Sequence, residues 1–307
     1  MTLTRRDVVE LLERHGLSPS RALGQNFVAD PNTVRRIARL AGVGPGDPVV
    51  EIGPGVGSLT TALVETGAQV TAVELDRHLV PVLEEVVAPL GVRVVQGDAL
   101  EVDWGELLAG HDRWALVANL PYNVGTTIVL QLLDDVPAID RMLVMVQREV
   151  GERLAAGPGS GTYGIPSVKA ALSARAEVVG RVPATVFIPQ PKVESVLVRL
   201  TRHPAPVVDV DHGALMALVR QAFGQRRKML RRSLAGRVSP EAFAAAGVAP
   251  EARPEQLGVA EWAALTAAVD PSTVRSRGAP GSEQARGLHG NQGAARRGGG
   301  GAGGQGA

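Results

Sequence analysis

Short apolar runs alternate with segments of helical periodicity along the first two thirds of the chain. Runs of four to eight mainly apolar residues between turn signals are typical of strands that are buried on both faces. The segments between them repeat apolar residues every three to four positions, as amphipathic helices do. This alternation predicts an α/β fold. The predicted strands are residues 48–52, 69–73, 92–96, 114–118, 141–147 and 196–200.

Capping signals mark the N-terminal helices. Thr4 can cap a helix that runs to about His15. Asp30, which precedes a proline, can cap a second helix that ends at Gly42. Further helices are predicted after two of the strands, at residues 128–133 and 148–154.

The last third of the chain has a different character. A proline-containing linker at 203–206 indicates a domain boundary near residue 203. Beyond it, apolar residues at helical spacing, a capped helix from Ser239 and a last helix from Glu255 to about Val269 predict a small helical domain. We therefore predict an α/β domain with an N-terminal helical extension at 1–203, a helical domain at 204–270, and a disordered Gly/Arg-rich tail at 271–307.

The composition excludes several kinds of protein. The sequence contains no cysteine, which excludes disulfides, thiolate metal sites and a cysteine nucleophile. The first residues lack the apolar core of a secretory signal, and no apolar stretch has transmembrane length. We therefore expect a cytoplasmic protein that has no membrane partner.

The distribution of charge is more informative than the net charge of +1. Five arginines and one glutamate follow Thr273, so the rest of the chain is net negative. Between Asp211 and Glu241, however, there are seven basic residues and no acidic one. Such a run is either a solvated helix face or a patch that contacts nucleic-acid phosphates. We predict RNA contacts from a basic helical segment containing Arg226, Arg227, Lys228, Arg231 and Arg232.

The segment N-L-P-Y-N at 119–123 directly follows a buried strand and precedes a helix. Ligands bind at this position in open α/β sheets, where loops leave the carboxyl ends of strands. Pro121 removes a backbone donor, so nearby carbonyls can point into a site. The amide of Asn119, these carbonyls and the ring of Tyr122 suit an exocyclic amine on a flat heterocycle. The alternative interpretation is an ordinary polar turn.

Three other predicted strands also end in residues suited to a ligand. The glycines at 53, 55 and 57 allow close backbone approach, although their spacing differs from that of dinucleotide-binding loops. Glu74 is placed to bind ribose hydroxyls, and Asp98 can accept a hydrogen bond from an adenine amino group. The alternative is that these are ordinary polar loop starts.

The order of these motifs resembles that of class I S-adenosylmethionine-dependent methyltransferases, which have a Rossmann-like fold. Within them, the chain resembles the ribosomal RNA small-subunit adenine N6,N6-dimethyltransferases, from about residue 15 to about residue 270. Val28 and Gly125 differ from the leucine and serine that are usual in that family. The matching motifs are L-G-Q-N-F at 23–27, E-I-G-P-G at 51–55, N-L-P-Y-N at 119–123 and F-I-P-Q-P-K-V-E-S at 187–195.

This resemblance implies the cofactor, the substrate and the site. The enzyme would methylate two adjacent adenosines near the 3′ end of 16S rRNA, within the 30S subunit or its precursor, as a monomer with a role in ribosome biogenesis. The target adenine would lie between the rings of Tyr122 and Phe187, with Asn119 and the Leu120 carbonyl on its amine and Pro121 shaping the loop. No metal is expected. The residues that would bind S-adenosylmethionine are Asn26, Val28, Gly53, Gly55, Glu74, Asp98 and Asn119.

Three alternative functions remain open at this point. A 23S rRNA adenine methyltransferase of the macrolide-resistance type would share most of the N-terminal motifs. A non-catalytic ribosome assembly factor would use the same surfaces without transferring methyl groups. A transcription-factor relative would bind duplex DNA and a polymerase. The basic segment around Arg226 and the form of the glycine turn favour the small-subunit enzyme over the first alternative.

Overall fold

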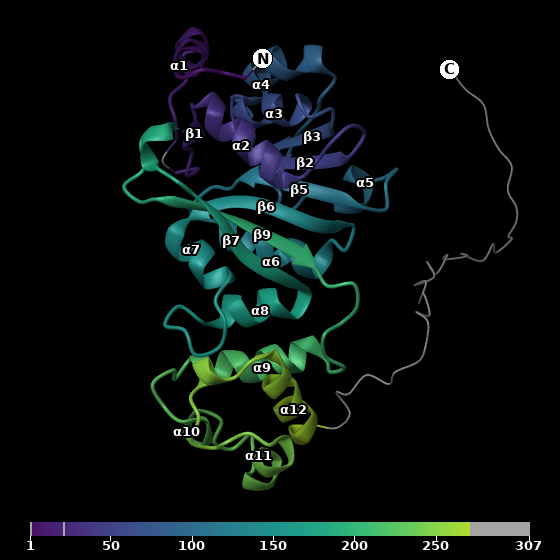
Figure 1. Ribbon diagram of the computed structural model, residues 1–307, viewed down its shortest axis with the longest axis vertical. Helices are drawn as coiled ribbons and strands as arrows, with labels where there is room; N and C mark the ends of the chain where they lie inside the picture. Colours follow the sequence, from purple (N-terminus) through teal and green to yellow (C-terminus); the bar gives the residue numbers. More distant parts are fainter. Residues whose placement is uncertain (1, 21, 271–307) are drawn as a thin grey trace, which may run out of the picture. The chain divides into compact units, whose positions relative to one another are not determined.

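The computed structural model of the chain describes residues 2–20 and 22–270 (Figure 1). The predicted disordered tail at 271–307 lies outside the described residues. No helix within the described ranges is long and apolar enough to cross a membrane.

The described residues form a seven-stranded sheet with the order β4-β3-β2-β5-β6-β9-β7. The first five of these strands are parallel, whereas β9 runs antiparallel to both β6 and β7. This arrangement confirms the predicted Rossmann-like α/β fold and all six predicted strands. The sheet consists of β2 (Pro48–Ile52), β3 (Gln69–Glu74), β4 (Arg93–Gln96), β5 (Trp114–Asn119), β6 (Ile139–Gln147), β7 (Ala174–Val182) and β9 (Ser195–Arg202).

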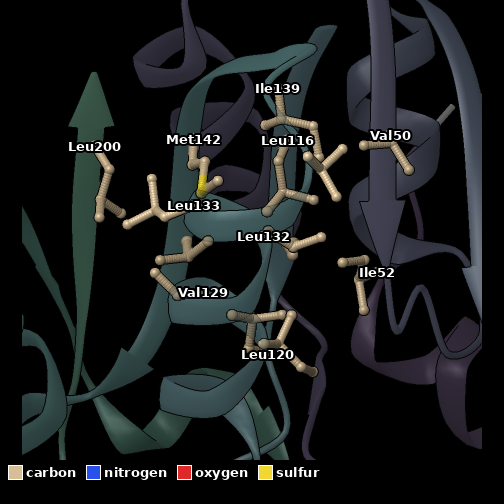
Figure 2. Packing of buried hydrophobic residues seen from close by; sticks show 14 of the residues in the cluster. Val50, Ile52, Leu116, Leu120, Val129, Leu132, Leu133, Ile139, Met142 and Leu200 are labelled. Carbon is tan, nitrogen blue, oxygen red and sulfur yellow. The ribbon is translucent and has the colours of Figure 1, made fainter. Parts of the chain in front are cut away.

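The central strands are apolar on both sides because helices cover both faces of the sheet. Side chains alternate along β5, so Leu116 enters one hydrophobic cluster and Val117 enters the other. Figure 2 shows Leu116 facing Leu132 of helix α6 (Gly125–Asp135), in the first cluster. Helix α2 (Pro31–Ala41) packs in the second cluster through Ile37. The two-sided burial explains why these strands lack a polar face.

The predicted caps of the first two helices are confirmed. The Thr4 hydroxyl accepts a hydrogen bond from the Asp7 backbone, and the Asp30 carboxylate accepts bonds at the start of α2. Gly42 ends α2 with φ +64°. The other helices that belong to the sheet layers are α1 (Arg5–Arg14), α3 (Ser58–Val64), α4 (Val80–Val87), α5 (Trp104–Leu107), α7 (Arg148–Leu154) and α8 (Ile165–Ser173), with 3₁₀ turns η1 (Ala88–Leu90) and η2 (Ala184–Val186).

The C-terminal helices share a hydrophobic cluster with α8, and the first of them lies beside α8 in Figure 1. Two predictions are wrong here. The basic segment is not one helix, because the chain turns at residues 224–229. The last helix begins at Val259 rather than Glu255, because the chain is extended at Gly258. The elements are α9 (His212–Phe223), α10 (Leu230–Ser233), α11 (Pro240–Ala246), η3 (Pro254–Gln256) and α12 (Val259–Val269).

A separate two-stranded ribbon joins two of the sequence motifs. Strand β1 (Phe27–Val28) pairs antiparallel with β8 (Phe187–Ile188). The backbone of Ala29 extends the pairing by donating to the Val186 carbonyl over 2.8 Å. The ribbon therefore fixes the loop that precedes β1 relative to the loop that precedes β9.

Candidate active site

The carboxyl ends of four neighbouring strands, β4, β3, β2 and β5, open into one pocket. The empty space between its walls, including the open mouth, is about 890 Å³. The pocket brings together all but one of the residues predicted to bind the cofactor, together with two further residues of the predicted catalytic set. These lining residues are Asn26, Gly53, Gly55, Glu74, Asp98, Asn119, Leu120 and Pro121.

The glycine turn after β2 forms one wall of the pocket. Gly53 and Gly55 have φ values of +68° and +61°, which side chains disfavour. A Cβ atom on Gly55 would also lie 2.7 Å from two carbons of the Phe27 ring. The Gly55 N–H donates to Glu74 Oε2 over 3.0 Å. The turn is therefore held by Phe27 on one side and by a carboxylate on the other.

Two carboxylates stand at the ends of β3 and β4. Glu74 also accepts from the Asp76 N–H over 2.8 Å, and burial raises the pKa of its carboxyl. Asp98 accepts from the Leu100 N–H over 2.9 Å. Each carboxylate oxygen keeps acceptor capacity beyond these bonds. Leu75, which is 51% exposed, adds an apolar surface to the pocket that sequence analysis did not identify.

The Asn119 side chain is oriented by the backbone of a distant loop. Its Nδ2 donates to the Asn26 carbonyl over 2.8 Å. Its Oδ1 is buried and has no hydrogen-bond partner among the described residues. A buried amide oxygen without a donor is costly. Asn119 therefore presents an unsatisfied acceptor at the pocket, where a ligand donor would complete it.

The two aromatic residues of the predicted stacking site differ in environment. Tyr122 is half-buried, whereas Phe187 has no exposed surface and packs in the cluster that contains Val34 and Ile37. The structure therefore contradicts the prediction that Phe187 offers a second stacking face. Val28, predicted to bind the cofactor, packs in the same cluster and does not line the pocket. Pairing of β1 with β8 buries both side chains in the core.

Glu51 is a buried acid behind the glycine turn. The side chain is 1% exposed, and its Oε2 lacks a hydrogen-bond partner within the described ranges. Burial, with a smaller contribution from the charge of Glu74, raises the pKa of Glu51 from 4.5 to about 8. Glu51 is therefore mainly protonated at neutral pH.

Glu51→Gln is expected to flatten the pH dependence of stability. Between pH 4.5 and about 8 the folded state keeps a proton that the unfolded chain releases, so the free energy of unfolding falls as pH rises through this range. The glutamine amide does not titrate, so the variant lacks this contribution to the pH dependence of the free energy of unfolding. Thermal unfolding of both proteins from pH 5 to pH 9 should show the variant gaining relative stability as pH rises. An equal slope for the two proteins would contradict this assignment.

The predicted RNA-binding residues are all exposed, but they have different partners. Arg226 donates to the Gly161 carbonyl over 2.9 Å and pairs with Glu255 at 3.8 Å. Arg231 pairs with Glu251 at 3.5 Å. Three other basic side chains differ from these two. Within residues 2–20 and 22–270, ion pairs and hydrogen bonds are absent for the side chains of Arg227, Lys228 and Arg232.

The pocket residues fit S-adenosylmethionine. The strongest sign is the unsatisfied Asn119 Oδ1, together with a carboxylate at the end of β3 and a glycine turn that leaves no side chain in the pocket. In the described part of the chain, no group of three or more His, Cys, Asp or Glu side chains is arranged to hold a metal ion.

Comparison with known proteins identifies the family. The model of the ribosomal RNA adenine dimethylase family matches residues 17–270. The chain belongs to the ribosomal RNA adenine dimethylase family. This dimethylase is therefore an S-adenosylmethionine-dependent transferase whose substrate is ribosomal RNA.

Relatives of this dimethylase carry a more specific name. Ribosomal RNA small subunit methyltransferase A from Kineococcus radiotolerans is 49% identical over 288 residues, covering 91% of this chain and 95% of the relative. The protein of the same name from Streptomyces coelicolor is 48% identical, covering 84% and 94% of the two chains.

Solved structures agree on the fold of the dimethylase. The 23S rRNA methyltransferase ErmE superposes with a TM-score of 0.63 at 26% identity, covering 80% of this chain and 99% of that chain. A dimethyladenosine transferase from Plasmodium falciparum superposes with a TM-score of 0.65 at 22% identity, covering 78% and 95%. The small-subunit relatives are thus much closer in sequence than the 23S enzyme.

Proposed function

We propose that this dimethylase converts two adjacent adenosines near the 3′ end of 16S rRNA to N6,N6-dimethyladenosine, within the 30S subunit or its precursor. The names of the relatives that are 46–49% identical support the small subunit. The single observation that carries the chemistry is the unsatisfied Asn119 Oδ1 at the pocket, in the loop that also carries the half-buried Tyr122.

Cofactor binding is assigned to residues of the pocket. Glu74 would bind the ribose hydroxyls, and Asp98 would accept from the adenine amino group of the cofactor. Asn26 and the glycine turn would border the rest of the molecule. When bound, S-adenosylmethionine supplies an activated methyl group.

The substrate amine is oriented by the loop after β5. A target adenine that has left its RNA stack would lie against Tyr122. Asn119 Oδ1 and the Leu120 carbonyl would accept its two N6–H bonds, which draws the nitrogen lone pair out of ring conjugation. Pro121 supports this loop, since its carbonyl accepts from the Gly125 N–H at the start of α6 over 2.9 Å. Orientation of this kind can supply about 7–11 kcal/mol of a reaction barrier.

Residues 204–270 are proposed as a small helical domain that contacts RNA, and the enzyme is proposed to act as a monomer. The exposed basic residues without partners in the described ranges, Arg227, Lys228 and Arg232, suit phosphate contacts. Arg226 and Arg231 are already paired with acids and would contribute less.

Arg227→Gln and Lys228→Gln are each expected to weaken binding to the ribosomal particle and to lower its salt dependence. Each lost phosphate contact should reduce the slope of log affinity against log salt by about 1. Arg113→Gln is the matched control, because Arg113 pairs with Asp140 and precedes β5, at the end of that strand opposite the pocket. Binding titrations at several salt concentrations measure this, and equal slopes for all four proteins would contradict the assignment.

Methyl transfer to purified particles tests the proposed substrate. Labelled S-adenosylmethionine is incubated with this dimethylase and either 30S particles that lack adenine methylation or 50S particles. Label in the 30S particles alone supports the proposal. Label in 50S RNA would preserve the chemistry and refute the small-subunit assignment, and no label in either particle would favour a non-catalytic assembly factor.

A further inference from the structure

The hydroxyl of Tyr122 is fixed by a serine from another part of the chain. Tyr122 Oη lies 2.7 Å from Ser195 Oγ, and either atom can be the donor. Ser195 has no exposed surface, and Tyr122 is half-buried. The hydrogen bond is thus shielded from water, and it restrains the rotation of the tyrosine ring about its side-chain bonds.

Ser195 is itself held rigidly at this edge of the sheet. As the first residue of β9, it pairs with Gln147 of β6 on one side and with Val182 of β7 on the other. The preceding residue, Glu194, accepts from the Arg148 N–H over 2.9 Å. Asn119, the last residue of β5, pairs with Met145, which lies two residues before Gln147 on β6. The strand register therefore places the serine hydroxyl beside the loop that follows β5.

We propose that Ser195 is a positioning residue for the second of the two methyl transfers, through the ring of Tyr122. This inference rests on dimethylation of adenine. In each transfer an N6–CH₃ bond forms as the S–CH₃ bond of S-adenosylmethionine breaks, S-adenosylhomocysteine is the leaving group, and the replaced N6 hydrogen is released as a proton. The unmodified amine offers two N–H bonds to its acceptors, but the once-methylated amine offers only one. Alignment in the second transfer therefore depends more on the stacking face, and hence on the bond that fixes Tyr122.

The ratio of monomethyladenosine to dimethyladenosine during a time course tests the proposal. With Ser195→Ala, the first transfer should slow by about twofold and the second by about tenfold, within the effect of one neutral hydrogen bond. Monomethyladenosine therefore accumulates, while the KM for S-adenosylmethionine is unchanged. A purely structural defect would slow both transfers equally, and either that result or a wild-type ratio would overturn the proposal.

Two further variants separate positioning from folding. Ser195→Thr keeps the hydroxyl and should restore a ratio near that of the wild type, even if less folded protein is obtained. Tyr122→Phe removes the other half of the bond but keeps the ring, so it should accumulate monomethyladenosine as Ser195→Ala does. The double variant should be no worse than either single one, and additive effects would contradict the proposal.

The test does not depend on which ribosomal subunit is the substrate. The ratio is measured on whichever ribosomal RNA the wild-type enzyme methylates, so a wrong subunit assignment leaves the result interpretable. A wild-type enzyme that stops at monomethyladenosine would overturn the inference directly.

Discussion

Asn119→Ala is expected to reduce methyl transfer by on the order of 10²–10³-fold in kcat, the usual effect of removing one preorganised hydrogen-bonding group from an active site. The variant loses the Oδ1 acceptor, which is buried and unsatisfied within the described residues. As positive charge develops on the adenine amine, this acceptor would stabilise it in surroundings that exclude water. The predicted loss is therefore larger in the transfer step than in binding.

Steady-state kinetics and cofactor titration separate these two effects. Asn119→Ala also loses the bond to the Asn26 carbonyl, so cofactor affinity should fall by about tenfold or less. Asn119→Asp is the matched variant, because it keeps an acceptor at nearly the same place but cannot donate to Asn26. It should retain more activity than Asn119→Ala at saturating cofactor. A kcat within threefold of the wild type for Asn119→Ala would refute the assigned role.

Gly55→Ala is expected to produce the second largest effect, a loss of cofactor affinity of about 10–100-fold. The new Cβ would meet the Phe27 ring at 2.7 Å, and overpacking of this kind costs roughly 1–3 kcal/mol. The φ of +61° adds a further strain of about 1–2 kcal/mol. Relief of this strain would displace the turn and its bond to Glu74.

Gly91→Ala is the control for backbone strain at positive φ in the absence of a steric contact. Gly91 has φ +77°, but a Cβ there would meet nothing within 4 Å. It should lower thermal stability slightly and leave cofactor binding unchanged. Titration of S-adenosylmethionine against both variants measures the difference. Equal cofactor affinities for the two variants would show that the contact between Gly55 and Phe27 does not shape the pocket.

The sequence predicts the central sheet well because burial leaves a local signature. β2 and β5 are apolar on both faces, so their runs stand out in the sequence. β7 was not predicted as a strand, since it lies at the edge of the sheet, carries exposed charges such as Arg175 and Arg181, and shifts register near Gly180. The β7 segment therefore lacks the apolar continuity on which such predictions depend.

The site is predictable only in part, for the same physical reason. Strand ends can be located from local patterns, and the structure brings the residues at three of these ends, Glu74, Asp98 and Asn119, to one pocket. Contacts between distant segments have no local signature. The bond from Asn119 to Asn26 spans 93 residues, and that from Tyr122 to Ser195 spans 73.

Phe187 illustrates the limit of a motif. An aromatic residue close to prolines in a loop motif is compatible with stacking on a base and with burial in a core. Pairing of β8 with β1 decides between them, and it directs the ring into the cluster around Ile37. The same pairing buries Val28, which the sequence placed at the cofactor.

The most direct measurement is nucleoside-resolved mass spectrometry of 16S rRNA from unmethylated 30S particles after incubation with S-adenosylmethionine and the wild-type protein or Asn119→Ala. We predict N6,N6-dimethyladenosine at two adjacent positions near the 3′ end with the wild type, and essentially none with the variant. Methylation of another nucleoside, of 23S rRNA instead, or of the same sites by Asn119→Ala would contradict the central claim that the Asn119 pocket dimethylates adenine in small-subunit RNA.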